Sequence, residues 1–517
     1  MTRTEKTMRN VRLALVCQVI TLITNFITHR LIVSFLAPEY LSVGGLFTNI
    51  MTVLSLAELG VGASITFSLY KPLNEGDEGK LAALMKLFRR AYTAIGTVVL
   101  ALGVALLPLL RFFVDDFDAA LAAVPDFYVI YILYVVNAGA SYFLAYSRTL
   151  IIADQKKYVT SVFSSLSQAT LCIAACFVLW LTKNYVVFMA ITVGVTLAEN
   201  VALYLFAKKT YPYLNNKSAE KLTADDKSTI KANVTASMMH NVGGVLVNGT
   251  DNIIISRFVG FLTEGIYSAY HLIAAAVDSM LRPIFQSATA SFGDLSVEAE
   301  SERRREVFDR MFFAGAWLYG FSAIAIVVLS KPFVALWLGD GFEIDEPSVT
   351  LVALNFYLLG MRRPGMSARE AMGLLRYDKW KSIAEAAINI VFSIILAKYL
   401  GLFGVLLGTT ASSMLTCFWV EPIVLYRRGF GTGAGKFFAR YGVYTAVTAA
   451  AGAATFFLCR AIPLGGIGGF AIKAAACLIV PNAVYLATYF KIDEFKYFNM
   501  LIKSKIKRLS NKNASEN

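Results

Sequence analysis

The stretch DQKKYVTSVFSSLSQATLCIAACFVLWLTKNY, residues 154–185, contains the pattern that decides the fold. Lys156 and Lys157 precede an apolar run over 158–181, and a short polar turn follows the run. A bilayer core of roughly 30 Å is crossed by about 20 apolar residues in a helix. The stretch is therefore typical of one membrane-spanning helix with a basic end.

Comparable apolar runs recur along all 517 residues. With 57% hydrophobic and 16% charged residues, the composition is that of one integral membrane body and not of soluble domains. We expect an all-α integral membrane protein with about 14 transmembrane helices. The expected spans are 12–36, 43–70, 91–113, 127–152, 158–181, 185–207, 232–259, 265–291, 312–338, 348–375, 382–400, 402–426, 441–460 and 466–490.

The basic residues between these spans fall on one side. With the N-terminus inside, the inner segments carry 35 Lys and Arg residues and the outer loops carry five. The outer loops are acidic instead, as at 115–118 and 340–346. The positive-inside rule then predicts that both termini are cytoplasmic. The inner segments are 1–12, 71–90, 154–158, 208–231, 293–310, 376–381, 427–440 and 491–517.

Two landmarks suggest an internal repeat. The corner FLAPEYLSVGGLF at 35–47 is similar to FVGFLTEGIYSAY at 258–270, an offset of 223 residues. The inner ends of the fourth and tenth spans, with Arg148 and Arg369, match at an offset of 221. This repeat predicts two pseudo-symmetric six-helix lobes around a central cavity, plus two extra C-terminal helices. The expected parts are an N-terminal lobe (1–207), a cytoplasmic linker (208–231), a C-terminal lobe (232–427), helices 13 and 14 (428–490) and a basic cytoplasmic tail (491–517) that lies on the inner leaflet as an amphipathic helix.

Basic residues inside the spans are the sharpest functional signal. An arginine at the centre of a membrane helix costs about 3 kcal/mol, so it is usually paired or faces water. Each such arginine therefore contacts a ligand in a water-filled cavity, forms a structural ion pair, or reaches an interface. The eight positions are Arg30, Arg148, Arg257, Arg282, Arg362, Arg363, Arg369 and Lys473, of which Arg30, Arg257, Arg282, Arg362 and Arg363 form the predicted cationic, substrate-binding cavity.

Few acidic residues accompany them, and these are candidates for counter-ions or for coupling to an ion. For His29 a hydrogen-bonded structural role is the stronger alternative. No nucleophile–base pair, Walker lysine loop or metal-ligand cluster occurs, so we expect neither an enzyme nor a cofactor or metal. The net charge of +13 is spread over loops beside membrane helices, which favours anionic lipids as partners over nucleic acid. The candidate acidic and histidine residues are Glu58, Asp251, Asp278, Glu199 and His29.

The run LGVGASITFSLY at 59–70, before a charged inner loop, and the corner at 35–47 resemble the bacterial polysaccharide-transport flippases. These form the oligosaccharide flippase family of the multidrug/oligosaccharidyl-lipid/polysaccharide superfamily. The resemblance implies that the chain moves an undecaprenyl-pyrophosphate-linked oligosaccharide from the inner to the outer leaflet of a bacterial cytoplasmic membrane, by alternating access, for surface polysaccharide biosynthesis.

Arginine suits such cargo because its planar guanidinium donates two hydrogen bonds to phosphate oxygens. The resemblance further implies sugar contacts from Asn25, Asn137, Tyr142 and Asn355, and polysaccharide-assembly proteins as partners. Energy comes from a gradient of H⁺ or Na⁺, or from the membrane potential. One alternative is a cation-coupled drug or metabolite antiporter of the same superfamily. A membrane-embedded polysaccharide polymerase or ligase is the alternative from another class.

Overall fold

The computed structural model describes residues 3–58, 61–215, 222–298, 301–378, 380–501 and 503–504. Every regular element within these ranges is helical, so the predicted all-α class is confirmed. Helices suit a bilayer because they satisfy their own backbone hydrogen bonds. Among the described residues, eight helices are long and apolar enough to cross a membrane, and up to nine if a pair bent by 87° counts as one span. The predicted ranges lie largely on helical residues, but length and apolarity do not establish the number 14.

The α-helices follow one another with short connections. In chain order they are α1 (Arg3–Phe35), α2 (Glu39–Leu54), α3 (Val61–Glu75), α4 (Glu78–Ala105), α5 (Phe117–Ala123), α6 (Phe127–Phe143), α7 (Ala145–Ala153), α8 (Lys157–Thr182), α9 (Tyr185–Thr210), α10 (Ala224–Phe258), α11 (Phe261–Glu298), α12 (Ser301–Leu338), α13 (Glu346–Ala371), α14 (Lys381–Leu415), α15 (Cys417–Val424), α16 (Gly435–Arg460) and α17 (Gly466–Tyr489). The 3₁₀ segments are η1 (Ser55–Glu58), η2 (Leu107–Phe112), η3 (Pro212–Asn215) and η4 (Leu374–Tyr377), and a π-helical segment, η5, covers Leu425–Phe430.

The chain divides into two compact units. Unit 1 comprises Met1–Ala269 and Lys379–Ser412, and unit 2 comprises Tyr270–Asp378 and Ser413–Asn517. Two of the three boundaries fall inside α11 and α14, and the third falls between η4 and α14. The predicted division into lobes at 1–207 and 232–427 cuts the chain elsewhere and stays a prediction.

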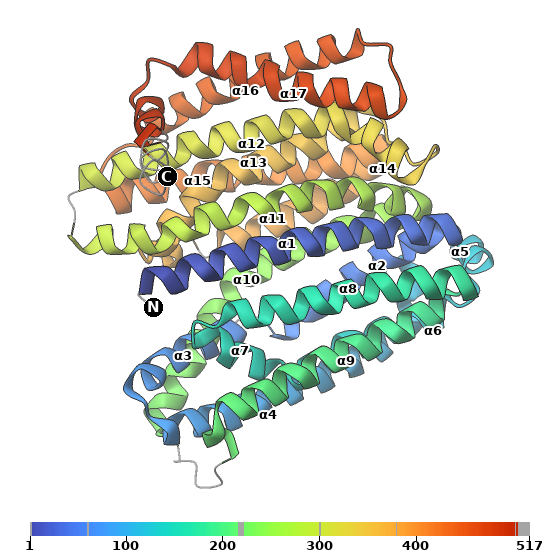
Figure 1. Cartoon of the computed structure of the whole chain (residues 1–517), viewed down its shortest axis with the longest axis vertical. Helices are drawn as coiled ribbons and strands as arrows, with labels where there is room; N and C mark the ends of the chain where they lie inside the picture. Colours follow the sequence, from blue (N-terminus) through green and yellow to red (C-terminus); the bar gives the residue numbers. More distant parts are fainter. Residues whose placement is uncertain are drawn as a thin grey trace, which may run out of the picture. The chain divides into compact units, whose positions relative to one another are not determined.

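In unit 1 the long helices pack side by side, α1 on α8, α8 on α9, α9 on α6 and α6 on α4 (Figure 1). Glycines make the α4–α6 contact close. A Cβ atom at Gly103 would come within 2.8 Å of a methyl carbon of Val135, and one at Gly139 would overlap Leu100. Small residues at such crossings let helices approach closely in a membrane, where van der Waals packing replaces the hydrophobic effect as the attraction.

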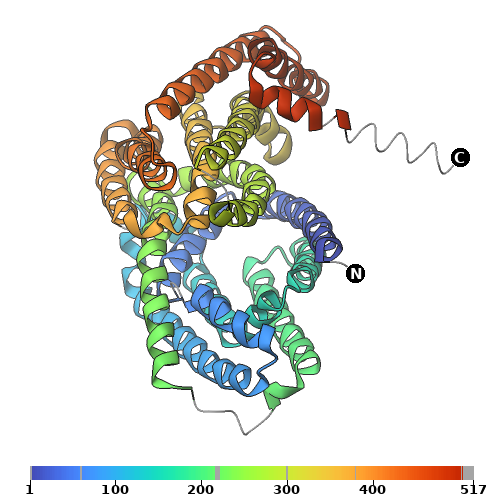
Figure 2. The same cartoon turned by 90° about the vertical axis from the view of Figure 1, so that its left-hand side faces the viewer.

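In unit 2 the helices α16 and α17 pair with each other and with α12, which also packs along α13 (Figures 1 and 2). The helical start of the tail joins them: Phe495 stacks on Trp317 with ring centroids 6.0 Å apart, and Phe498 stacks on Phe313 at 6.3 Å. The apolar side of the predicted amphipathic tail therefore contacts α12 over this part. The tail beyond residue 504 lies outside the described residues.

Three boundaries test the predicted spans. The turn predicted between 382–400 and 402–426 is confirmed, because Gly401 leaves helical geometry with φ 57° and ψ −136° inside α14. The span predicted at 43–70 is wrong as one continuous helix, since α2 ends at Leu54 and α3 begins at Val61. The predicted loop at 111–126 contains α5 and part of η2.

The predicted topology places Asp116 and Asp345 outside and Asn216 inside. Asp116 and Asp345 are poor positions for cysteine labels, because each caps a helix by accepting a backbone N–H at 3.0 Å. Loss of such a cap costs about 1 kcal/mol. Asn216 lies outside the described residues. Exposed neighbours without these roles are Asp118 and Asp340 on the predicted outer side and Lys209 on the inner side.

We expect cysteines at positions 118 and 340 to react with a membrane-impermeant maleimide in intact cells, whereas a cysteine at 209 reacts only after permeabilisation. The reason is the 35-to-5 division of basic residues between the two sides. Labelling is measured by the shift in mass of the purified protein. Reaction of position 209 in intact cells, with no reaction at 118 and 340, would reverse the topology.

Candidate functional site

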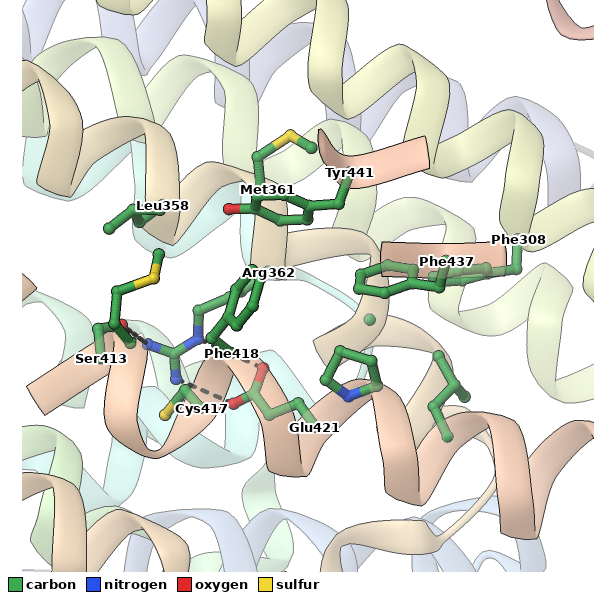
Figure 3. A pocket seen from close by; sticks show the side chains of 14 residues that line it. Phe308, Leu358, Met361, Arg362, Ser413, Cys417, Phe418, Glu421, Phe437 and Tyr441 are labelled. Carbon is green, nitrogen blue, oxygen red and sulfur yellow. Dashed lines mark hydrogen bonds and ion pairs between the residues drawn. The ribbon is translucent and has the colours of Figure 1, made fainter. Parts of the chain in front are cut away.

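Arg362 lies in the middle of α13 and forms an ion pair with Glu421 of α15. Its Nη2 lies 2.9 Å from Glu421 Oε1 and its Nε lies 3.3 Å from Oε2, which is a two-pronged contact (Figure 3). Its Nη1 donates to Ser413 Oγ at 3.4 Å. The side chain of Glu421 is only 4% exposed, so this pair is shielded from solvent.

The neighbouring Arg363 points to a different helix. Its Nη2 donates to Asp278 Oδ2 of α11 at 2.6 Å, and its Nε donates to Oδ1 at 3.3 Å. The Tyr319 hydroxyl of α12 also donates to Asp278 Oδ1, at 2.9 Å. Asp278 therefore serves as the counter-ion of Arg363 in this structure, and a tyrosine completes its hydrogen bonding.

Arg369, two turns after Arg362 in α13, shares Glu421 with Arg362, whereas Arg363 pairs with Asp278. It is 2% exposed and pairs with Asp378 and, at 3.0 Å, with Oε1 of Glu421. Three arginines of α13 thus meet three carboxylates within unit 2. Each of the three arginines has a carboxylate partner, so Arg362 and Arg363 form structural ion pairs in this structure.

A narrow pocket opens beside Arg362 (Figure 3). Phe308, Phe418, Phe437 and Tyr441 contribute its aromatic walls. Arg362 and Glu421 form its polar end, and their charges already satisfy each other. The pocket accordingly suits an apolar group and offers no net charge to an anion.

Two of the five predicted cavity arginines differ from the others. The side chains of Arg30 on α1 and Arg282 on α11 are exposed. Neither makes a hydrogen bond or ion pair with any side chain that the structure describes. The third, Arg257, ends α10 and donates to the carbonyl oxygens of Val114 at 3.0 Å and Asp115 at 3.5 Å. Among the five, Arg30 and Arg282 are therefore the two without a hydrogen-bond or ion-pair partner in the part of the chain that the structure describes.

In unit 1 the predicted carboxylates have local partners. Glu199 of α9 accepts from Arg148 and, at 2.8 Å, from Ser164 of α8. It lines a second pocket, whose other walls include hydroxyl groups of α1 and α8. Glu58 accepts from the Tyr92 hydroxyl at 3.1 Å.

His29 has a local role in the described structure. Its Nδ1 lies 2.9 Å from the backbone oxygen of Asn25, one turn earlier in α1. The Asn25 side chain accepts from Gln168 of α8 at 3.0 Å. These contacts fit the structural alternative for His29. The hydrogen bond between Asn25 and Gln168 also links α1 to α8, and Asn25 is one of the residues predicted to contact sugar.

Asp251 of α10 lies in a cluster of oxygen atoms. The Thr409 hydroxyl donates to Asp251 Oδ2 at 2.9 Å, and Asn389 Nδ2 donates to Thr409 Oγ1 at 3.0 Å. Both Asp251 Oδ1 and Asn389 Oδ1 are buried and have no hydrogen-bond partner among the described residues. Buried oxygens without a donor are uncommon in proteins.

Sequence reasoning missed Glu421 and Glu264. Glu421 is the single acidic residue of the span 402–426, so its presence in an apolar run was a usable signal. Glu264 was assigned to the loop that ends at residue 265, yet it lies in the first turn of α11 and is 0% exposed. Its burial depends on the packing of α2, which no local pattern reveals.

The fold of this chain is similar to those of several solved structures. An inward-facing multidrug resistance MATE family transporter of the MOP superfamily is 14% identical, with a TM-score of 0.62 over 77% of this chain and 93% of that one. The lipid II flippase MurJ, in an inward closed conformation, is 13% identical, with a TM-score of 0.61 over 92% and 98%. A mutant form of the Vibrio cholerae MATE transporter VcmN is 12% identical, with a TM-score of 0.57 over 82% and 96%.

At these identities the comparison establishes the fold alone, which this chain shares with MATE family transporters and with MurJ. A family model described as polysaccharide biosynthesis protein matches residues 7–290, more than half of the chain. The chain belongs to this family. No curated protein sequence matches it. Family and fold together support a multi-pass membrane flippase or transporter of the MOP superfamily.

Proposed function

We propose that the protein flips an undecaprenyl-pyrophosphate-linked oligosaccharide from the cytoplasmic to the outer leaflet of a bacterial inner membrane, by alternating access. Support comes from its membership of the polysaccharide biosynthesis family and from a fold shared with the lipid II flippase MurJ. The protein acts on the cargo by moving it and makes or breaks no bond.

One observation carries the proposal. Arg30 and Arg282 lie on helices expected to span the membrane, yet no carboxylate in the described ranges neutralises them. The arginines Arg148, Arg362, Arg363 and Arg369 all have such a carboxylate. An unpaired arginine inside a membrane protein is costly and is kept where it faces water or an anionic ligand. A pyrophosphate needs donors of this kind when it leaves water.

The function is tested by depletion in cells that make surface polysaccharide. Loss of the protein is expected to leave the lipid-linked oligosaccharide complete but on the inner leaflet, where a membrane-impermeant glycan-oxidising reagent does not reach it. Accumulation of unpolymerised oligosaccharide on the outer leaflet would instead favour a polymerase or ligase. Normal export with altered drug or metabolite efflux would favour the antiporter.

We further propose that Asp251 takes part in coupling transport to a gradient of H⁺ or Na⁺. The support is its oxygen cluster with Asn389 and Thr409, in which two buried oxygens lack a donor. Three oxygen-bearing side chains of this kind suit a proton or a small cation. Such a site lets the gradient bias one conformation over another, because the ion binds them with different affinity.

Asp251→Asn is expected to keep the protein folded and inserted while removing the dependence of export on the ion gradient. Cargo flipping is compared in membrane vesicles with and without an imposed H⁺ or Na⁺ gradient. Asp340→Asn, at an exposed outer position, is the control and keeps the dependence on the gradient. If Asp251→Asn responds to the gradient as the unaltered protein does, Asp251 has no coupling role.

A further inference from the structure

The two repeated corners of the sequence pack against each other within unit 1. Ser42 of α2 and Gly265 of α11 are equivalent at the repeat offset of 223 residues, and they touch. A Cβ atom at Gly265 would lie 2.8 Å from the Ser42 backbone nitrogen. A Cβ atom at Gly45 would lie 2.8 Å from the carboxyl carbon of Glu264. The contact therefore requires glycine at both positions, and it presses one carboxyl group against the backbone of α2.

Glu264 has no exposed surface in this contact. Its Oε1 accepts a hydrogen bond from Asn252 Nδ2 of α10 at 3.0 Å. Its Oε2 is buried and has no hydrogen-bond partner, and among the described side chains it has no ion-pair partner either. The Ser42 hydroxyl, which lies against Gly265, is also fully buried and has no hydrogen-bond partner among the described residues. Buried polar oxygens without a donor are uncommon in proteins.

The groups around Glu264 do not compensate a negative charge. Among the described residues, the titratable side chains facing it are Tyr134 of α6 and Tyr267 of α11. The Tyr134 hydroxyl lies 3.1 Å from the Tyr185 hydroxyl of α9. On α10, Asp251 adds a further acidic group. The positive charge of Arg257 on the same helix is held by the carbonyl groups of Val114 and Asp115.

An ionised carboxylate without a cation costs several kcal/mol in such surroundings, whereas a protonated carboxyl group costs far less. Opening the contact would admit water, which hydrates the ionised form. The two states of the contact therefore bind the proton with different affinity, and proton release and opening promote each other.

We propose that Glu264 is a proton-binding site and that the contact between α2 and the start of α11 is closed while the proton is bound. By the predicted topology, Glu264 follows an outer turn, so the proton exchanges with the outer side. Lowering the outer pH closes the contact and raising it favours opening. If the protein is a flippase as proposed, closing of this contact makes one step of the transport cycle respond to outer pH. Proton binding at Glu264 itself does not depend on the proposed function.

The protonation state is tested by infrared spectroscopy on the full-length protein in lipid nanodiscs. A protonated carboxyl band is expected at neutral pH, with one component lost in Glu264→Gln and unchanged in Glu343→Gln. Glu343 is the matched control because it is 50% exposed and its ion pair with Lys331 is on the surface. If Glu264→Gln leaves the band of the unaltered protein unchanged, the group is ionised and the proposal is overturned.

The link to the contact is tested by amide hydrogen exchange of α2 and of the first turns of α11, at a series of pH values. Glu264→Gln mimics the protonated form, so it is expected to stay protected at every pH, while the unaltered protein loses protection relative to it as the pH rises. Equal exchange at every pH would overturn the proposal. Neither readout requires cargo, so failure here is distinct from failure of the proposed function.

A second variant covers the case in which Glu264→Gln does not insert. Asn252→Leu keeps the carboxyl group but removes the amide donor that stabilises its ionised form. Loss of that donor favours the proton. The loss of protection is therefore expected at higher pH than in the unaltered protein. An unchanged or lowered transition pH would contradict proton binding at Glu264.

Discussion

Arg282→Ala and Arg30→Ala are each expected to lower export of the lipid-linked oligosaccharide by roughly 10- to 100-fold, with the amount of inserted protein unchanged. A hydrogen bond to a charged group contributes about 1.5–3 kcal/mol, and each 1.4 kcal/mol is a factor of ten. Removal of an exposed, unpaired arginine leaves no buried carboxylate behind, so the fold has little to lose.

Export is measured by the fraction of cargo that a membrane-impermeant glycan-oxidising reagent modifies, and protein amount by immunoblot of membranes. Arg→Lys at either position is expected to restore part of the export, because an ammonium group keeps the charge but not the two-pronged geometry. Arg111→Ala is the matched control, since Arg111 is exposed in the predicted outer loop. Unaltered export by both alanine variants would remove the arginines from the cargo site.

Arg369→Ala is expected to reduce the amount of folded protein, in contrast to Arg30→Ala and Arg282→Ala, which leave it unchanged. Its side chain is 2% exposed and lies between Asp378 and Glu421. Breaking a buried ion pair by removing one member costs about 3–5 kcal/mol, because a buried charge is left uncompensated. That is a large share of the roughly 5–15 kcal/mol by which domains are typically stable.

The measurement is the yield and thermal unfolding temperature of the purified protein, beside Arg369→Lys and Arg362→Ala. Arg362→Ala is expected to be milder, because Glu421 keeps its contact with Arg369 at 3.0 Å. Arg369→Lys should recover part of the stability by keeping the charge. An unfolding temperature unchanged in Arg369→Ala would show that the ion pairs of Arg369 contribute nothing to stability.

The helices and the break at Gly401 could be predicted from the sequence. The length of an apolar run and the presence of a glycine are properties of neighbouring residues, so no knowledge of the packing is needed. The span predicted at 43–70 passed over the break between Leu54 and Val61, although the intervening residues include Ser55, Glu58 and Gly60. Sequence reasoning selected the five cavity arginines as one set, although the structure divides them. Arg362 pairs with Glu421, 59 positions away, and this depends on how α13 and α15 face each other. Local patterns contain no such information, so arginines with and without carboxylate partners look alike in the sequence.

The central claim is that this protein moves a lipid-linked oligosaccharide between leaflets with Arg30 and Arg282 as its unpaired cations. The direct test reconstitutes the purified full-length protein in liposomes that carry the labelled lipid-linked oligosaccharide on the inner leaflet only. We predict that the glycan becomes accessible to an external impermeant reagent with the unaltered protein, and stays largely inaccessible with the Arg30→Ala/Arg282→Ala double variant. Equal accessibility with the unaltered protein and with protein-free liposomes would contradict the account.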